Sequence, residues 1–403
     1  MLTDILRKKY VEVAAILVGR FLQSGMLFLI NLVFMSNSES ALYVDIGVAT
    51  AWAAPLSLIA MFGGYISATQ IKSKDSLKES AFLQAYLIYR PLFFLSVLIL
   101  CLYTAINYKT SFFIFIFSFT TFLALVGIAD AFLFRRKIAL FITANVVLSI
   151  LVGLSSFLVL NESANLYAIN CIWLIGVLIL ISFLTKCNII TKTGILFFLT
   201  HLRFFLVKNV GPSIVVIMSS VSLGIFLVMD RLLLPLYATT SELANYFAAI
   251  TLALPLNFLA VIHGKHANLN TYHSRFEERS GAETRLRNVF IVLLLGLLIL
   301  PIQWQILIRF TEYEFNILIQ TSLNLAACLI ILSKPSLAEI YAKKRLKIIT
   351  GINIFLIAVL VPAIIYFSSS FESVGTLRFS FNLLYLFLII SVLKRLLTSY
   401  RII

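Results

Sequence analysis

Long apolar runs alternate with short polar segments from one end of the chain to the other. A helix needs about 20 apolar residues to cross a bilayer core, and most of the runs reach that length. A membrane barrel would instead show weak alternation over about 10 residues per strand, which is not the pattern here. The runs therefore predict an all-α polytopic membrane protein with about twelve transmembrane helices. The predicted spans are residues 10–35, 42–69, 81–105, 111–134, 138–160, 166–186, 209–234, 243–262, 288–308, 315–333, 347–368 and 379–393.

Basic residues fall mainly on alternate loops, as the positive-inside rule expects of cytoplasmic segments. Most of the 32 Lys and Arg residues lie at the two ends of the chain or in residues 70–80, 135–137, 186–208, 263–287 and 334–347. The loops on the other side hold only Lys109, Arg309 and Arg378. This distribution predicts that both termini are cytoplasmic. The first apolar run exceeds the roughly 7 to 15 residues of a signal-peptide core, so we expect it to be retained as a span.

The composition agrees with a membrane protein. Hydrophobic residues make up 61% of the chain and charged residues 12%, whereas soluble domains are about 45–50% apolar. The net charge of +15 comes largely from the basic loops. Those loops can lie next to anionic lipid headgroups, so the charge indicates membrane lipids as partners and no nucleic acid.

The polar segments are too short to hold a catalytic domain. The longest, residues 263–288, has about 26 residues, which cannot form an independent core. No P-loop and no G-x-G-x-x-G motif occurs, so direct use of ATP is unsupported. The four cysteines have no paired spacing, and His263 and His266 lack a further ligand to complete a metal site. We expect a transporter and no enzyme, without cofactor or metal, driven by an ion gradient or by its cargo.

The two halves of the chain resemble each other. Residues 54–64, APLSLIAMFGG, align with residues 254–264, LPLNFLAVIHG, at an offset of 200. Because equivalent spans would run in the same direction, the repeat is parallel, with its axis along the membrane normal. We predict two six-helix lobes around a central cavity. The predicted domains are residues 1–188, an amphipathic cytoplasmic linker helix at 189–208, and residues 209–403.

Two arginines fall near the middle of predicted spans, where a charge is costly and usually faces a cavity or a partner. Arg20 and Arg90 both belong to the first lobe, and Gln23 lies one turn from Arg20. Guanidinium groups bind phosphate oxygens in bidentate geometry and stay charged, so a cavity lined by this pair would suit an anionic cargo. The alternative is that Arg20 pairs with an acid such as Glu12 and only holds helices together.

A third charged position lies at the predicted outer end of the seventh span, where Asp230 and Arg231 are adjacent. The functional interpretation is an outer gate or cavity lining together with Tyr246, close to Glu242. The alternative interpretation is an interfacial anchor whose charged ends extend to the headgroups.

The stretch around this pair, MDRLLLPLYATTSELANYFAAITLALP, resembles the seventh and eighth spans of bacterial O-antigen-type polysaccharide flippases. Those proteins belong to the multidrug/oligosaccharidyl-lipid/polysaccharide exporter superfamily. The first span, LVGRFLQSGMLFLINLVFM, is similar to theirs in its polar positions, and span count and loop sizes extend the resemblance along the chain. Where such flippases have Gly before the aromatic residue that opens the eighth span, this chain has Asn245.

The resemblance implies a protein of the bacterial inner membrane that flips undecaprenyl-pyrophosphate-linked oligosaccharide to the outer leaflet for O-antigen or capsule biosynthesis. It implies a polysaccharide polymerase and a chain-length regulator as partners. Asp130 and Glu339, at inner span ends, are the candidates for coupling to Na⁺ or H⁺, and pairing with the adjacent basic triplets is the structural alternative. A peptidoglycan-precursor flippase and a cation-coupled multidrug antiporter of the same superfamily are the alternative functions.

Overall fold

The computed structural model describes the helical parts of the chain. The described residues are 25, 28–36, 40–61, 89, 93, 96, 97, 100, 110–133, 138–160, 166–186, 192–201, 203, 210–273, 282–342 and 346–399. Apart from turns, these ranges are helical and contain no strand. Arg20, Gln23 and Arg90 lie outside the described residues.

Seven described helices are long and apolar enough to cross a membrane. Their candidate spans are Ala41–Ile59, Met218–Leu236, Thr240–Ala260, Val289–Phe310, Ile317–Leu337, Leu346–Tyr366 and Phe371–Lys394. Long apolar helices are the structures that satisfy every backbone polar group within a bilayer. The predicted fold class, an all-α polytopic membrane protein, is therefore confirmed.

The chain divides into two compact units. One contains Met1–Ile30 and Asp45–Ile225, and the other contains Asn31–Val44 and Phe226–Ile403. Helix α2 (Ser40–Met61) and helix α10 (Val210–Leu233) each contribute residues to both units. Helix α9 (Lys192–Thr200) lies in the first unit, inside the segment for which the sequence predicts a linker helix. The domain limits at 188 and 209 stay predictions.

The first unit contains a three-helix group formed by α6 (Thr110–Leu133), α7 (Ile138–Leu160) and α8 (Leu166–Lys186). Trp173 of α8 packs edge-on against Phe119 and Phe122 of α6, with ring centroids 4.9 and 5.2 Å apart. A Cβ atom at Gly176 would lie only 2.2 Å from the Leu151 side chain, so this glycine allows α8 to approach α7 closely. Aromatic packing and one small residue thus hold the three helices together.

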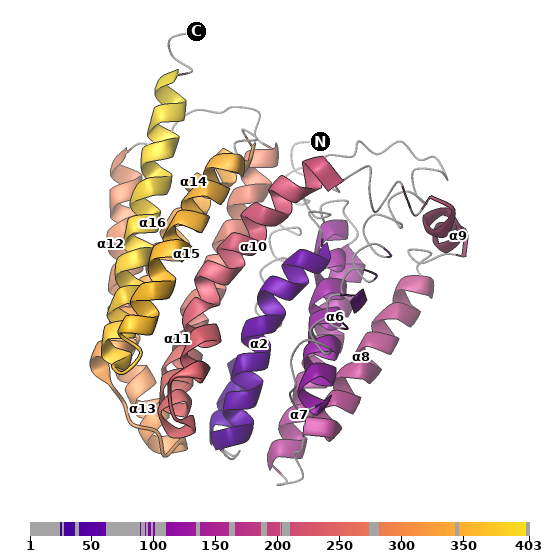
Figure 1. Ribbon diagram of the computed structural model, residues 1–403, viewed down its shortest axis with the longest axis horizontal. Helices are drawn as coiled ribbons and strands as arrows, with labels where there is room; N and C mark the ends of the chain where they lie inside the picture. Colours follow the sequence, from indigo (N-terminus) through magenta and orange to yellow (C-terminus); the bar gives the residue numbers. More distant parts are fainter. Residues whose placement is uncertain are drawn as a thin grey trace, which may run out of the picture. The chain divides into compact units, whose positions relative to one another are not determined.

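The second unit is built around α14 (Ile317–Ala342), which packs against α11 (Thr240–His273), α12 (Ala282–Leu298), α13 (Leu300–Phe310) and α16 (Phe371–Ser399). In the candidate span of α14, 67% of the residues are buried, against 28% in α15 (Leu346–Tyr366). The exposed side chains of α15 include Ile354, Phe355 and Val359, which suit contact with lipid. Figure 1 shows α14, α15 and α16 running alongside one another.

The ninth predicted span, residues 288–308, matches the candidate span Val289–Phe310, and the helix has a one-residue break within it. Helix α12 ends at Leu298 and α13 begins at Leu300, with Pro301 in its first turn. Proline has no backbone N–H and is favoured at the first turn of a helix, so Pro301 ends one hydrogen-bonding ladder and starts the next. Hydropathy is continuous across the break, which explains why the sequence pattern predicted one helix.

The structure corrects the start of the twelfth predicted span. Residues 379–393 were predicted, but α16 begins at Phe371 and therefore contains Arg378. Ser370 caps this helix, because its Oγ accepts a hydrogen bond from the backbone N–H of Ser373 at 3.4 Å. Glu372 in the first turn also favours a helix start. The prediction that Arg378 lies in an outer loop is wrong, and the residue lies in the second turn of a span.

Candidate functional site

The end of α10 is fixed by a short turn into α11. A single 3-10 turn, η3 (Leu234–Leu236), follows α10, and the Leu234 carbonyl accepts hydrogen bonds from the backbone N–H groups of Tyr237 and Ala238. Thr239 and Glu242 then form a capping box, in which Thr239 N donates to Glu242 Oε2 at 3.0 Å and Glu242 N donates to Thr239 Oγ1 at 3.4 Å. This turn sets the position of Asp230 relative to Tyr246.

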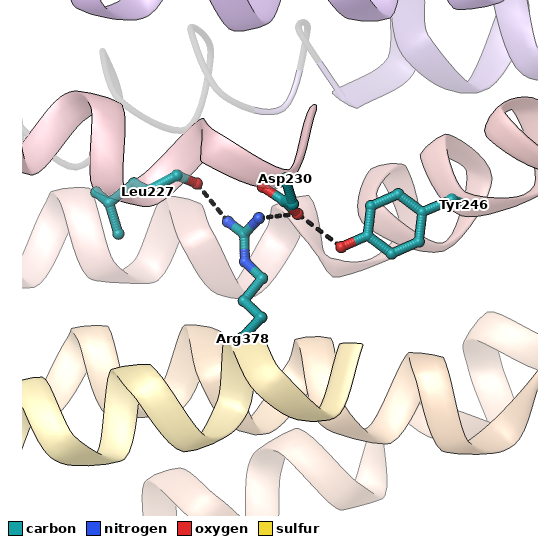
Figure 2. Close-up of polar contacts among 4 residues, drawn as sticks. All are labelled: Leu227, Asp230, Tyr246 and Arg378. Carbon is teal, nitrogen blue, oxygen red and sulfur yellow. Dashed lines mark hydrogen bonds and ion pairs between the residues drawn. The ribbon is translucent and has the colours of Figure 1, made fainter. Parts of the chain in front are cut away.

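Asp230 is the centre of a buried polar cluster that joins three helices. Its Oδ2 accepts a hydrogen bond from the Tyr246 hydroxyl of α11 at 2.6 Å and also bonds Nη1 of Arg378 from α16. Nη2 of Arg378 donates to the carbonyl oxygen of Leu227, one turn before Asp230 on α10. Figure 2 shows the Arg378 guanidinium between these two acceptors. We call Asp230, Arg231, Tyr246 and Arg378 the acid–arginine cluster.

Burial makes these contacts energetically important. Asp230 is 3% exposed and Tyr246 is 1% exposed, and the side chain of Arg378 is 16% exposed. The Tyr246 ring packs 5.5 Å from that of Phe371, at the start of α16. A charge within a span is costly unless it is paired, and removal of one partner leaves the other charge uncompensated. Asp230 and Arg378 therefore depend on each other in the folded protein.

Arg231 lies beside this ion pair but takes no part in its hydrogen bonds. Its charge interacts with those of Asp230 and Arg378. Its Nε is buried without a hydrogen-bond partner among the described residues, and the same holds for Oδ1 of Asp230. Arg231 as a whole residue is partly exposed. The cluster thus contains one carboxylate and two guanidinium groups.

The structure brings two of the sequence-predicted residues into direct contact, Asp230 and Tyr246, with Arg231 next to them. The ion-pair partner of Asp230 is Arg378, which the sequence analysis assigned to a loop. The cap at Ser370 and the acid at Glu372 were the signals that could have placed Arg378 within a helix. A gating role for Asp230, Arg231 and Tyr246 stays a prediction.

The structure does not describe the side chains of the other predicted site residues. Asp130 lies on α6 and Glu339 on α14, and the structure describes the helix at both positions but not the side chains. Their suggested role in coupling to Na⁺ or H⁺ stays a prediction. The same is true of the anion-binding role for Arg20, Gln23 and Arg90.

A second buried polar group lies at the break between α12 and α13. Asn324 and Gln303 donate to each other's side-chain oxygens, at 2.8 and 3.0 Å. Asn324 Nδ2 also donates to the Gly296 carbonyl at 3.0 Å, and Gln303 Nε2 donates to the Leu252 carbonyl at 2.7 Å. Gln320 Nε2 adds a bond to Asn324 Oδ1 at 3.2 Å. We call Gln303, Gln320 and Asn324 the amide cluster, and it holds α11, α12, α13 and α14 together at the break.

Comparison with solved structures finds a similar protein along nearly the whole chain. The crystal structure of the eukaryotic MATE transporter AtDTX14 matches with a TM-score of 0.55 and 12% sequence identity, over 97% of this chain and 96% of that chain. At this identity the likeness shows a shared fold. No family model and no curated protein sequence matches the chain. The likeness supports the predicted all-α polytopic fold along nearly the whole chain.

Proposed function

We propose that this protein is a transporter that moves an undecaprenyl-pyrophosphate-linked oligosaccharide from the inner to the outer leaflet of a bacterial inner membrane. Three kinds of observation support the proposal. The fold matches a transporter along 97% of the chain. The sequence around Asp230 resembles polysaccharide flippases, and the two charges nearest the middle of predicted spans, Arg20 and Arg90, are both arginines.

The charge balance of the acid–arginine cluster is the observation that carries the anionic cargo. Asp230 is the one charged residue among the fully buried side chains that the structure describes. It is already neutralised by Arg378, and Arg231 adds a second positive charge beside it. A transporter that binds organic cations needs a buried acid free to pair with its cargo. A net positive cluster instead favours an anionic cargo, because guanidinium groups match phosphate oxygens.

In the proposed mechanism, Arg20, Gln23 and Arg90 bind the pyrophosphate inside the first lobe. The lipid tail stays in the bilayer, so the cavity has to admit only the charged group and the sugar. Rocking of the two lobes then exposes the cargo to the other side. The contacts of Asp230 with Arg378 and Tyr246 hold α10, α11 and α16 together at the predicted outer end. Opening of an outer gate at this end would break those contacts or replace them with contacts to other partners.

Two other functions are supported by some of the same observations. A cation-coupled multidrug antiporter is the second candidate, because the similar solved structure is that of a MATE transporter. A peptidoglycan-precursor flippase would also handle a pyrophosphate lipid, and the same arginines would serve it. The chemistry of the cargo, an anionic lipid or an organic cation, distinguishes the proposed flippase from the antiporter.

The decisive experiment is reconstitution of the full chain in proteoliposomes with a fluorescent pyrophosphate-linked oligosaccharide lipid. We expect the native chain to flip this lipid, and the Arg20→Ala and Arg90→Ala variants to lose flipping at equal, verified insertion. An undecaprenyl-pyrophosphate-linked muropeptide tests the peptidoglycan alternative in the same vesicles. Export of an organic cation without flipping of either lipid would replace the proposal with the antiporter.

A further inference from the structure

The acid–arginine cluster carries more donors than its own acceptors can use. Guanidinium groups only donate hydrogen bonds, and an ionised carboxylate only accepts them. Asp230 Oδ2 already receives bonds from Tyr246 and Arg378, and the second arm of Arg378 uses the Leu227 carbonyl. Arg231 makes none of these bonds, so its Nε and one positive charge remain in excess among the described residues.

Helix geometry keeps Arg231 from completing the cluster by itself. Asp230 Oδ1 and Arg231 Nε both lack hydrogen-bond partners among the described residues, although the two residues are adjacent. Neighbouring residues on a helix do not face each other, so the Arg231 side chain leaves α10 in a different direction from the Asp230 carboxylate. The unused acceptor and the unused donor therefore remain apart.

The position of Arg231 suits a ligand that arrives from the membrane surface. The residue lies in the last turn of α10 and is partly exposed, while its Nε is buried. An anion at the surface can thus approach Arg231, whose charge lies beside a desolvated N–H. A charge-assisted hydrogen bond of this kind is about twice as strong as a neutral one.

We propose that Arg231, backed by the positive charge of Arg378, binds a phosphate-class anion at the predicted outer end of the second unit. Two sources would supply this chemistry, a phospholipid headgroup at the membrane surface or the pyrophosphate of the cargo as it leaves. The second source rests on the function proposed above, and the first does not. Asp230 limits the affinity of the site, because its carboxylate repels an anion and holds Arg378.

The test uses the purified full chain in a maltoside detergent, which contains no phosphate. The chain carries Arg20→Gln and Arg90→Gln throughout, so that the predicted first-lobe site does not contribute. Inorganic pyrophosphate is titrated at constant ionic strength, and binding is measured from the shift of the thermal unfolding midpoint. A parallel titration uses phosphatidylglycerol in mixed micelles, which reports the headgroup as the source.

We expect Arg231→Gln to weaken binding of at least one of these two probes by about tenfold or more, because the free guanidinium is lost. Arg309→Gln is the matched control, since Arg309 is an exposed arginine in the last turn of α13. It should leave both titrations unchanged. Asp230→Asn should tighten binding, because the repelling carboxylate becomes neutral. Arg231→Lys should retain part of the affinity.

The inference is overturned if Arg231→Gln leaves both titrations unchanged, or if Arg309→Gln weakens binding equally, which would indicate general charge attraction. It is also overturned if Asp230→Asn folds and does not tighten binding. These results are independent of the flipping assay, which depends on Arg20 and Arg90. Flipping that requires those two arginines, combined with no effect of Arg231→Gln on binding, would retain the proposed function and remove this site.

Discussion

The two buried polar clusters of the second unit differ in charge and in the groups that lack a hydrogen-bond partner among the described residues. These are Gln320 Oε1 in the amide cluster, and Asp230 Oδ1 and Arg231 Nε in the acid–arginine cluster. In the amide cluster, Asn324 and Gln303 each donate to and accept from the other, because an amide carries both a donor and an acceptor. In the acid–arginine cluster every charged group either only donates or only accepts, so pairing depends on the number of acids and arginines. With one carboxylate and two guanidinium groups, donors are left over.

This difference indicates different uses. The amide cluster bonds to the backbone carbonyls of Gly296 and Leu252 at a helix break, so it stabilises a fixed arrangement of helices. The acid–arginine cluster connects side chains on three helices and keeps an unused donor on Arg231. Neutral polar clusters in spans hold helices together, whereas charged ones mark sites of function. Four experiments test this contrast, from the largest expected effect to the smallest.

Arg378→Gln should give the largest loss of stability. It leaves the buried Asp230 carboxylate with Tyr246 as its side-chain partner, and breaking a buried ion pair costs about 3–5 kcal/mol in the free energy of unfolding. Denaturant unfolding of the purified protein in detergent measures this change. The double variant Asp230→Asn with Arg378→Gln should recover much of the loss, because neither member of the ion pair then carries a charge. Arg309→Gln is the control, and a loss for Arg378→Gln no larger than its own would contradict the assignment.

Asn324→Ala should have the next largest effect. It removes the reciprocal amide pair and leaves Gln303 and the Gly296 carbonyl without their shared partner, at a cost of about 2 kcal/mol. The same unfolding measurement applies, and binding of inorganic pyrophosphate should be unchanged. Gln305→Ala, at an exposed position of α13, is the matched control. A stability loss that depended on pyrophosphate concentration would show that the amide cluster is coupled to the anion site.

A pair of hydroxyl deletions compares a charged with a neutral acceptor. Tyr246→Phe removes the bond to Asp230 and keeps the ring against Phe371, with an expected loss of about 1.5–3 kcal/mol. Tyr43→Phe removes a bond of 2.7 Å to the Thr251 hydroxyl, with an expected loss of about 0.5–1.5 kcal/mol. Both tyrosines are buried, so the difference in unfolding free energy reports the charge of the acceptor. Equal losses would mean that Asp230 is not charged in the folded protein.

Thr239→Ala should have the smallest effect. It removes one half of the capping box at the start of α11, which is worth about 0.5–1 kcal/mol at an exposed helix end. Thermal unfolding should show a small decrease, and Thr239→Ser should restore the cap. If Thr239→Ala instead weakened transport strongly with little loss of stability, the turn between α10 and α11 would be part of the moving gate.

Much of the fold could be predicted from the sequence, because hydropathy reports each helix separately. Helix α10 (Val210–Leu233) closely matches the predicted span 209–234, and the candidate span Thr240–Ala260 closely matches the predicted span 243–262. The break at Pro301 was missed, because apolar residues continue on both sides of it. The start of α16 was placed eight residues too late, since Glu372 and Arg378 made its first turns appear too polar for a span.

The candidate site could be predicted only in part. Asp230 and Tyr246 are 16 residues apart across a short turn, so their proximity follows from the hairpin that the sequence predicts. Arg378 is 148 residues from Asp230, and no local pattern connects them. The same holds for Gln303 and Asn324, which meet only because α13 and α14 pack together. The roles of Arg20, Gln23 and Arg90 remain predictions from the sequence.

The sequence by itself determined that this chain crosses the membrane as helices, because the hydrophobic effect and backbone hydrogen bonding act within each span. It also determined where charges enter the spans. The tertiary structure alone decided which charges meet, since pairing depends on how helices that are distant in sequence pack. That packing pairs Asp230 with Arg378 rather than with its neighbour Arg231. It leaves the Nε donor of Arg231 without a hydrogen-bond partner among the described residues.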